Sequence, residues 1–180
     1  MTDWLKRARE SWGYNGSERP PFAVVPKEGE RSVWDFPRPP AIEPVPQSVI
    51  VRHDRIDIAH TKAALRVLET ASPPTYYIPP TDIDMSQLVK LPGKTSMCEW
   101  KGTATYWALK SMGNHPIAWS YPKPYPEFQE LQDYLAFYPQ PLECYVDGVT
   151  VTAQPGAFYA GWITPDLVGP FKGEPGTGHW

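Results

Sequence analysis

The sequence predicts a mainly β protein of compact antiparallel sheets, with one or two short helices and extended proline-rich arms. Two features of composition lead to this fold class. The chain contains 23 prolines among 180 residues, well above the roughly 5% of average usage, and proline disfavours long helices and central strands. It also contains 8 Trp, 10 Tyr and 6 Phe residues, and aromatic side chains are enriched in strands. Together they favour short strands joined by rigid turns around an aromatic core.

Length, charge and hydropathy narrow the class of protein further. A chain of 180 residues is long enough for one well-buried core and short for two. The formal net charge is −3, so we expect no basic face for nucleic acid. No apolar run approaches the roughly 20 residues of a membrane helix, and the opening MTDWLKRARE lacks the apolar segment of a secretory signal. We therefore expect a cytoplasmic protein with no nucleic-acid or membrane partner.

Residues 1–47 are expected to form an aromatic, proline-rich N-terminal arm. WLKRARESW fits two helical turns, which the glycines and prolines of GYNGSERPPF end. VWDFPRPPAIEPVP is typical of an extended segment, with Trp34 and Phe36 pointing the same way. Two interpretations remain open: an arm that wraps the domain and buries its rings, which we favour, or a docking peptide for a proline-reading partner. Such aromatic arms also offer a route to a homo-oligomer.

The core is expected to occupy residues 48–152 and to begin with a β-hairpin. In QSVIVRHDRIDIAHT, valines and isoleucines alternate with polar residues on either side of residues 53–55. Strict alternation places the apolar side chains on one face, as in a half-buried strand. Two strands with a polar tip at 53–55 are therefore predicted.

A helix is predicted for KAALRVLET at residues 62–70. Thr61 is a suitable N-cap, and the apolar residues repeat with helical spacing. Arg66 and Glu69, three residues apart, would then pair, either as a surface pair of little consequence or, turned inward, as a desolvated pair at a pocket. The Ser-Pro-Pro sequence at 72–74 would end this helix, because the residue before a proline is disfavoured in the α region.

Short strands account for the rest of the core. TYYIPP predicts an aromatic strand, and after a turn at residues 91–93 a further strand follows Gly102. The segment from 114 to 138 predicts an aromatic strand, one helical turn at 127–131 and a strand at 134–138. LECYVDGVTVTA predicts a hairpin with Asp147-Gly148 as its turn. Residues 153–180 are again rich in glycine, proline and aromatics, so we expect a second arm packed on the core.

Four segments, in this order, resemble a known family. VLETASPPTYYIPPTDI, TSMCEWKGTATYW, AWSYPKPYPEF and LAFYP are similar to the bacterial and fungal family known as domain of unknown function 427, over roughly residues 48–152. The resemblance implies a tent-like or half-barrel fold of two antiparallel sheets. Some such folds bind zinc through two cysteine pairs, but this sequence has no CxxC motif, so no metal is expected and no cofactor is indicated.

The same family has been labelled nucleotidyltransferase-like, which implies a second candidate site. Asp82 and Asp84 would place two carboxylates on one face of a strand, as magnesium chemistry needs. Nothing upstream resembles the glycine turn that would hold a triphosphate. Metal-dependent nucleotidyl transfer is therefore an alternative function and not the main hypothesis.

The candidate catalytic residues lie in TSMCEWKGTATYW, residues 95–107. A thiol reacts as the thiolate, and Lys101, three residues after Cys98, is a cation that would favour this form. Gly102 eases the tight turn that brings the two together, and Thr95 or Thr103 would donate a hydroxyl to a bound anion. Alternatively, Cys98 packs as a small apolar residue and Lys101 extends to water.

Aromatic side chains are the candidate pocket walls. The expected strands carry many rings, and most of these should build the core. The rings that we assign to a pocket are Tyr77, Tyr106, Trp119 and Tyr121. The sequence thus predicts a small-molecule pocket protein, with an enzyme that uses Cys98 and Lys101 as one hypothesis. A non-catalytic ligand-binding or structural module is the alternative.

Overall fold

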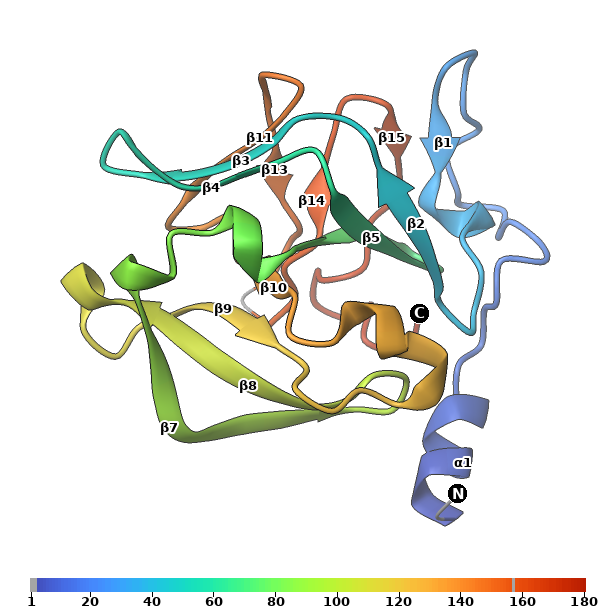
Figure 1. The fold of residues 1–180 in the computed structure, drawn as a ribbon. Helices are drawn as coiled ribbons and strands as arrows, with labels where there is room; N and C mark the ends of the chain where they lie inside the picture. The colour runs from blue at the N-terminus through green and yellow to red at the C-terminus, as the bar shows by residue number, and fades with distance from the viewer. Residues whose placement is uncertain (1–2, 157) are drawn as a thin grey trace.

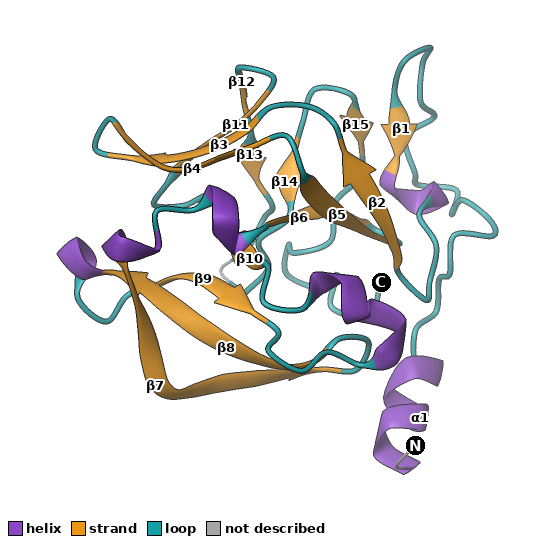
Figure 2. Ribbon diagram, viewed as in Figure 1, coloured by secondary structure: helices purple, strands orange, loops and turns teal. Residues whose placement is uncertain are grey.

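The computed structural model describes residues 3–156 and 158–180, in which short strands dominate (Figure 1). The strands are β1 (Arg31–Ser32), β2 (Ala41–Val45), β3 (Val49–His53), β4 (Ile56–Thr61), β5 (Ala64–Glu69), β6 (Ser72–Ile78), β7 (Leu88–Cys98), β8 (Gly102–Leu109), β9 (Pro116–Ser120), β10 (Leu135–Phe137), β11 (Glu143–Val146), β12 (Val149–Thr150), β13 (Thr152–Ala153), β14 (Trp162–Ile163) and β15 (Leu167–Val168). The helical segments of these residues are α1 (Asp3–Glu10) and the 3₁₀ turns η1 (Val33–Asp35), η2 (Pro80–Asp82), η3 (Met85–Gln87), η4 (Lys110–Met112) and η5 (Pro126–Leu131), all purple in Figure 2. None of these helices is both long and apolar enough to span a bilayer.

The main sheet has seven strands in the order β2-β5-β6-β10-β9-β8-β7, and all of its neighbours are antiparallel. A second antiparallel sheet has the order β12-β11-β3-β4 and lies above the long β7–β8 hairpin in Figure 1. Two short strand pairs, β1-β15 and β13-β14, are the other sheets among the described residues. Strands outnumber helices, and the expected mainly β class is confirmed. The antiparallel sheets do not close into a barrel.

Elements with a local sequence signal form where we expect them. Asp54 and Arg55 have φ angles of 49° and 68° in the turn between β3 and β4, as the tight turns of hairpins require. Asp147 and Gly148 have φ angles of 47° and 76° and form the turn between β11 and β12. β8 begins at Gly102, and α1, β6, β9, η5 and β10 form at the other predicted positions.

The helix predicted for residues 62–70 is wrong, because Ala64–Glu69 forms strand β5. This strand pairs with β2 on one side and with β6 on the other, and these neighbours bond its backbone. Helix propensity is weak enough for such pairing to override it. The prolines expected to end the helix, Pro73 and Pro74, lie in β6 beside a bulge in the β5–β6 register, where a missing N–H donor is tolerated.

The turn expected at residues 91–93 is a bend within one long strand, β7. The β7–β8 register shifts between Lys90 and Thr95, and Gly93 has a φ of 72°. A bulge of this kind bends its strand, and Figure 1 shows β7 turning sharply near its middle. The second half of β7 therefore runs directly into the hairpin end that carries Cys98.

Both terminal segments pack on the chain's own core. β2, which the sequence analysis places in the N-terminal arm, pairs with β5 at the edge of the main sheet. Trp34 and Phe36 are almost fully buried and pack with Leu68 and Leu167 in a small satellite cluster. Because the chain buries these rings itself, they lend no support to self-association through the arms.

The main sheet separates two hydrophobic clusters, because successive side chains of a strand point to opposite faces. The sealed face, between the main sheet and the four-stranded sheet, includes Val49, Val51, Ile58, Ile117, Leu135, Phe137 and Cys144. The pocket face, on the opposite side and under η5, comprises Val67, Tyr77, Trp100, Ala104, Tyr121, Phe128, Leu131 and Ala136. We name the first face for its close packing and the second for the cavity that opens on it.

Candidate functional site

A cavity of about 270 Å³ opens on the pocket face of the main sheet. Its walls are side chains that alternate along the strands: Tyr77 from β6, Tyr106 from β8 and Trp119 from β9. The ring of Tyr77 meets that of Trp119 edge-on, with centroids 6.4 Å apart. The strand period of two therefore places rings from three strands of the same sheet around one hollow.

The end of the β7–β8 hairpin carries the thiol and the ammonium to the cavity wall. Cys98 pairs with Gly102 across the hairpin, and the three residues between them form its tip. Gly102 has a φ of 94°, which suits glycine, and the backbone N–H of Tyr125 donates to the carbonyl of Lys101 at 3.2 Å. Cys98 is a half-buried free thiol, Lys101 is 8% exposed, and both line the cavity.

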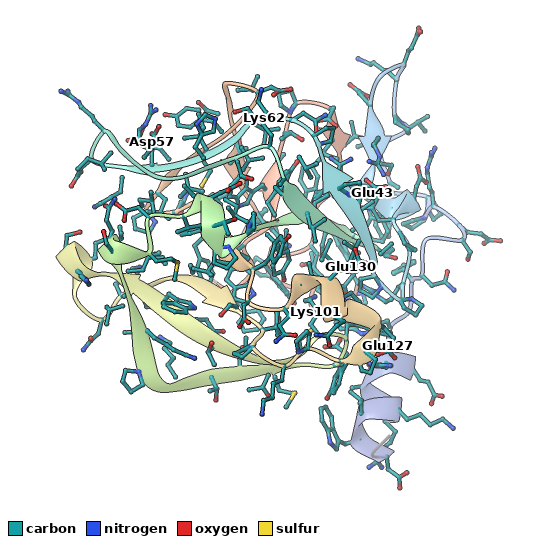
Figure 3. The ribbon with its side chains drawn as sticks, in the orientation of Figure 1. Glu43, Asp57, Lys62, Lys101, Glu127 and Glu130 are labelled. Atoms are coloured by element: carbon teal, nitrogen blue, oxygen red, sulfur yellow. The ribbon has the colours of Figure 1, made fainter. Side chains whose placement is uncertain are left out.

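Lys101 is a buried cation without a carboxylate partner among the described residues. Its ammonium lies 5.7 Å from the centre of the Phe128 ring in η5, and Figure 3 shows the residue beside this segment. Burial alone would lower the pKa of Lys101, but interactions with Cys98 and Tyr77, and with two glutamates, raise its pKa above the ordinary value. Lys101 is therefore an ammonium at neutral pH.

Two further polar groups at the cavity lack acceptors. The Tyr77 hydroxyl and the Trp100 indole N–H are buried and find no acceptor within residues 3–156 and 158–180. The Trp119 indole interacts with the Tyr77 oxygen, but it is itself a donor. Burial raises the pKa of Tyr77 to about 12, so its hydroxyl stays protonated and remains a donor. Buried polar groups are nearly always satisfied in native proteins, so unpaired donors at a cavity point to a missing acceptor.

The N-terminal arm clamps the tip of the β7–β8 hairpin. The Arg9 side chain donates to the Glu99 carbonyl at 2.8 Å, and the Trp12 indole donates to the Glu99 carboxylate at 3.0 Å. The Arg9 guanidinium also lies 5.0 Å from the centre of the Trp100 ring. Since Trp12 and Glu99 line the cavity, the arm both holds the tip and covers the hollow.

The C-terminal segment contributes a second buried cation, Lys172. Its ammonium lies 3.8 Å from the centre of the Trp12 ring and donates to the main-chain oxygen of Trp180 at 2.8 Å. Burial and the nearby Arg38 guanidinium lower the pKa of Lys172 to about 8. Arg38 is itself paired with Glu69 at 3.3 Å. The two lysines thus differ, because Lys172 has a hydrogen-bond acceptor and a cationic neighbour.

The structure brings most of the predicted site residues to this cavity and leaves two elsewhere. Those that line it are Cys98, Lys101, Tyr77, Tyr106, Trp119, Tyr121 and Glu69. Thr95 is exposed on β7 and lies outside the lining. The predicted Arg66–Glu69 pair does not form, because Arg66 pairs with Glu43 of β2 at 2.9 Å, from the other face of β5. A strand, unlike a helix, separates residues three apart onto opposite faces.

Most of the lining residues were not predicted from the sequence, among them Trp12, Trp100 and Lys172. Trp100 lies between the two candidate catalytic residues, so its position at the hairpin tip was a usable signal. Trp12 and Lys172 carry no such signal, because they reach the cavity from opposite ends of the chain.

A second hollow of about 520 Å³ adjoins the cavity. Tyr106, Tyr138 and Tyr159 line both spaces. The rest of its lining includes Pro139 and Pro141, which follow β10. The two hollows therefore adjoin, with Cys98 and Lys101 in the lining of the first and Pro139 and Pro141 in the lining of the second.

The two aspartates of the alternative site are engaged locally. Asp82 accepts from the Thr61 hydroxyl at 2.6 Å, and Asp84 accepts from the side chains of Ser86 and Gln87 at 2.5 and 2.8 Å. Asp82 is the last residue of η2 and Asp84 is the N-cap of η3, so neither lies in a strand and the expected strand geometry is wrong. Within the described ranges, no group of three or more His, Cys, Asp or Glu residues is placed to hold a metal ion.

Comparison with known proteins places these observations in a family. A family model described as a domain of unknown function (DUF427) matches residues 41–151, more than half of the chain. No curated protein matches the sequence. The matched residues include the hairpin with Cys98 and Lys101, whereas Trp12 and Lys172 lie in the segments on either side of the match.

Proposed function

The chain belongs to the DUF427 family, and from its cavity we propose that it is a small-molecule enzyme with Cys98 at the reacting centre. The observation that carries the proposal is that a free thiol and an unpaired buried ammonium line the same cavity. A thiolate is the reactive form of cysteine, and a neighbouring cation favours it. Two free cysteines also suit a reducing compartment, and we propose a cytoplasmic location on that ground.

Lys101 is assigned the electrostatic role in this proposal. Its raised pKa keeps it charged at neutral pH, so it acts as a cation and not as an amine nucleophile. Nucleophilic attack is then left to Cys98, which is half-buried and reachable from the cavity. Tyr106, Trp119 and Tyr121 supply the apolar walls that exclude water around a bound ring.

The test is the relative reactivity of the two thiols. Cys144 lies in the sealed face at 2% exposure, and burial raises its pKa. We expect iodoacetamide to alkylate Cys98 on the order of 100-fold faster than Cys144 in the native protein, because labelling of Cys144 requires local opening. Peptide mass spectrometry measures both rates, and Lys101→Met should slow the labelling of Cys98.

Equal and slow labelling of both thiols would remove the enzyme hypothesis. The non-catalytic alternative is then tested by a ligand that stabilises the wild type in a thermal-shift assay. If Cys98→Ser keeps the full affinity and no product forms in either protein, the cavity is a binding site without chemistry. A ligand that turns over only when Cys98 is present supports the proposal.

A further inference from the structure

Three hydrogen-bond donors at the cavity have no acceptor among the residues that the structure describes. These are the Lys101 ammonium, the Tyr77 hydroxyl and the Trp100 indole N–H, and their residues are 8%, 0% and 5% exposed. Leaving such a buried donor unpaired costs about 1–3 kcal/mol. All three stand within one cavity wall with the half-buried thiol of Cys98. The arrangement therefore matches a ligand that presents an acceptor oxygen next to an electrophilic atom.

We propose that the substrate is an aromatic carbonyl compound, and that Tyr77 and Lys101 bind its carbonyl oxygen while Cys98 attacks the carbonyl carbon. This inference rests on the proposed function and names the substrate class for the same site. Donors that are already in place where charge develops are the commonest large source of catalysis in acyl and carbonyl chemistry. Trp100 is the third candidate donor to this oxygen.

The charges around the cavity favour a neutral carbonyl group over a polyanion. Glu69 and Glu99 balance Lys101 and Lys172 in the lining, so the cavity has no net positive charge to attract a phosphate or a dicarboxylate. A Cys98 thiolate would already offset the charge of Lys101, since the two interact in the folded protein. A carbonyl group adds no charge on binding, and its oxygen becomes negative only as the thiolate adds.

The chemical step balances without a further reactant. The Cys98 sulfur donates an electron pair to the carbonyl carbon, the C–S bond forms, and the C=O π bond breaks toward oxygen. The resulting alkoxide is held by the Tyr77 hydroxyl and the Lys101 ammonium. With an aldehyde, the proton that the thiol lost returns to this oxygen, which gives a hemithioacetal. The addition is reversible, so it can be measured as binding.

The size and lining of the cavity suit an aromatic substituent. A cavity of about 150 Å³ in another protein holds benzene, and the cavity here is about 270 Å³. Trp119 and Tyr106 present ring surfaces to this space, and the adjoining hollow continues beyond Tyr106. A fused two-ring aldehyde therefore fits, with its carbonyl group beside Cys98, Lys101 and Tyr77.

The experiment uses naphthaldehyde as the probe and measures its reversible binding by the loss of carbonyl absorbance and by calorimetry. We expect binding to the wild type and none of the absorbance change with Cys98→Ser. Tyr77→Phe should weaken binding roughly 5-fold, since one hydrogen bond to the neutral hemithioacetal oxygen is worth about 1 kcal/mol. Tyr76→Phe is the matched control, because it removes a neighbouring hydroxyl from the opposite face and should leave affinity unchanged.

Iodoacetamide alkylation of Cys98 in the same variants separates the two proposals. Alkylation creates no oxygen that would accept a hydrogen bond from Tyr77, so Tyr77→Phe should weaken aldehyde binding about 5-fold more than it slows alkylation. Fast alkylation of Cys98 together with equal aldehyde affinity of wild type and Tyr77→Phe would overturn the carbonyl inference and leave the reactive thiol standing. Slow alkylation of Cys98 would overturn both. If Tyr77→Phe does not fold, Trp100→Phe, read by the same ratio, replaces it.

Discussion

The same strands build the sealed face and the pocket face of the main sheet, but the side chains pack closely on the first and leave a cavity on the second. Tyr76 and Tyr77 are neighbours in β6 and both are buried. Tyr76 points to the sealed face and stacks on Trp162, with ring centroids 4.8 Å apart. Tyr77 points to the cavity, and its hydroxyl has no acceptor within the described residues. A step of one residue along β6 thus moves a side chain from the closely packed face to the face with the cavity.

The two cysteines repeat the contrast. Cys144 lies on the sealed face among aliphatic side chains, and burial raises its pKa. Cys98 lies on the cavity wall beside an ammonium. Protein interiors are close-packed and their polar groups are paired unless function requires otherwise. The difference between the faces therefore supports the proposal that any chemistry takes place on the pocket face, without reference to any motif.

The largest predicted effect concerns packing on the sealed face. Phe137 is fully buried there, so Phe137→Ala should lower the free energy of unfolding by about 3–5 kcal/mol, as measured by urea denaturation. Tyr138, the next residue, lines both hollows and is only half-buried. Tyr138→Ala should cost well under half as much, because it enlarges an existing space. Equal losses at the two positions would show that the pocket face is packed as tightly as the sealed face.

A smaller effect should appear in the pH dependence of stability, through Lys172. Burial and Arg38 lower its pKa to about 8, against 10.5 for an ordinary lysine. Between these values the unfolded chain binds more protons than the folded protein, so the free energy of unfolding should rise with pH from about 8 to 10. The slope contributed by one such group cannot exceed about 1.4 kcal/mol per pH unit.

Denaturation at several pH values measures this slope, with Lys172→Met as the comparison. The groups that face Lys172 are Arg38, Glu69, Glu99, the Trp12 and Tyr159 rings and the main-chain oxygen of Trp180. None of them is changed by the substitution, so the difference between the two proteins isolates the lysine. Parallel curves for wild type and variant over pH 8–10 would mean that Lys172 is not a desolvated cation of the pocket face.

How far the sequence predicts this contrast depends on the range of the interactions. The turns at Asp54-Arg55 and Asp147-Gly148 are local and were predicted correctly. The proximity of Cys98 and Lys101 is also local, because one hairpin tip carries both residues. β5 was mistaken for a helix, because the strands that pair with it, β2 and β6, impose an extended conformation on a sequence with helical spacing.

The residues that cover the cavity cannot be predicted from local sequence patterns. Lys172 and Trp12 meet at 3.8 Å although they lie near opposite ends of the chain. Arg66 finds its partner Glu43 through the pairing of β5 with β2, which no spacing within one segment indicates. Residues that build a wall from one hairpin can be predicted from sequence, whereas residues that close it from the two arms require the fold.

The smallest predicted effect is the sharpest test of the two faces, because it removes one oxygen atom. Tyr77→Phe deletes a buried hydroxyl that has no acceptor among the described residues, so the free energy of unfolding should rise by about 1 kcal/mol. Tyr76→Phe deletes a hydroxyl that interacts with Arg66 and should lower it by about the same amount. Urea denaturation of the ligand-free proteins measures both. A loss of stability in Tyr77→Phe would mean that its hydroxyl is already satisfied, and the argument that this cavity lacks an acceptor would fail.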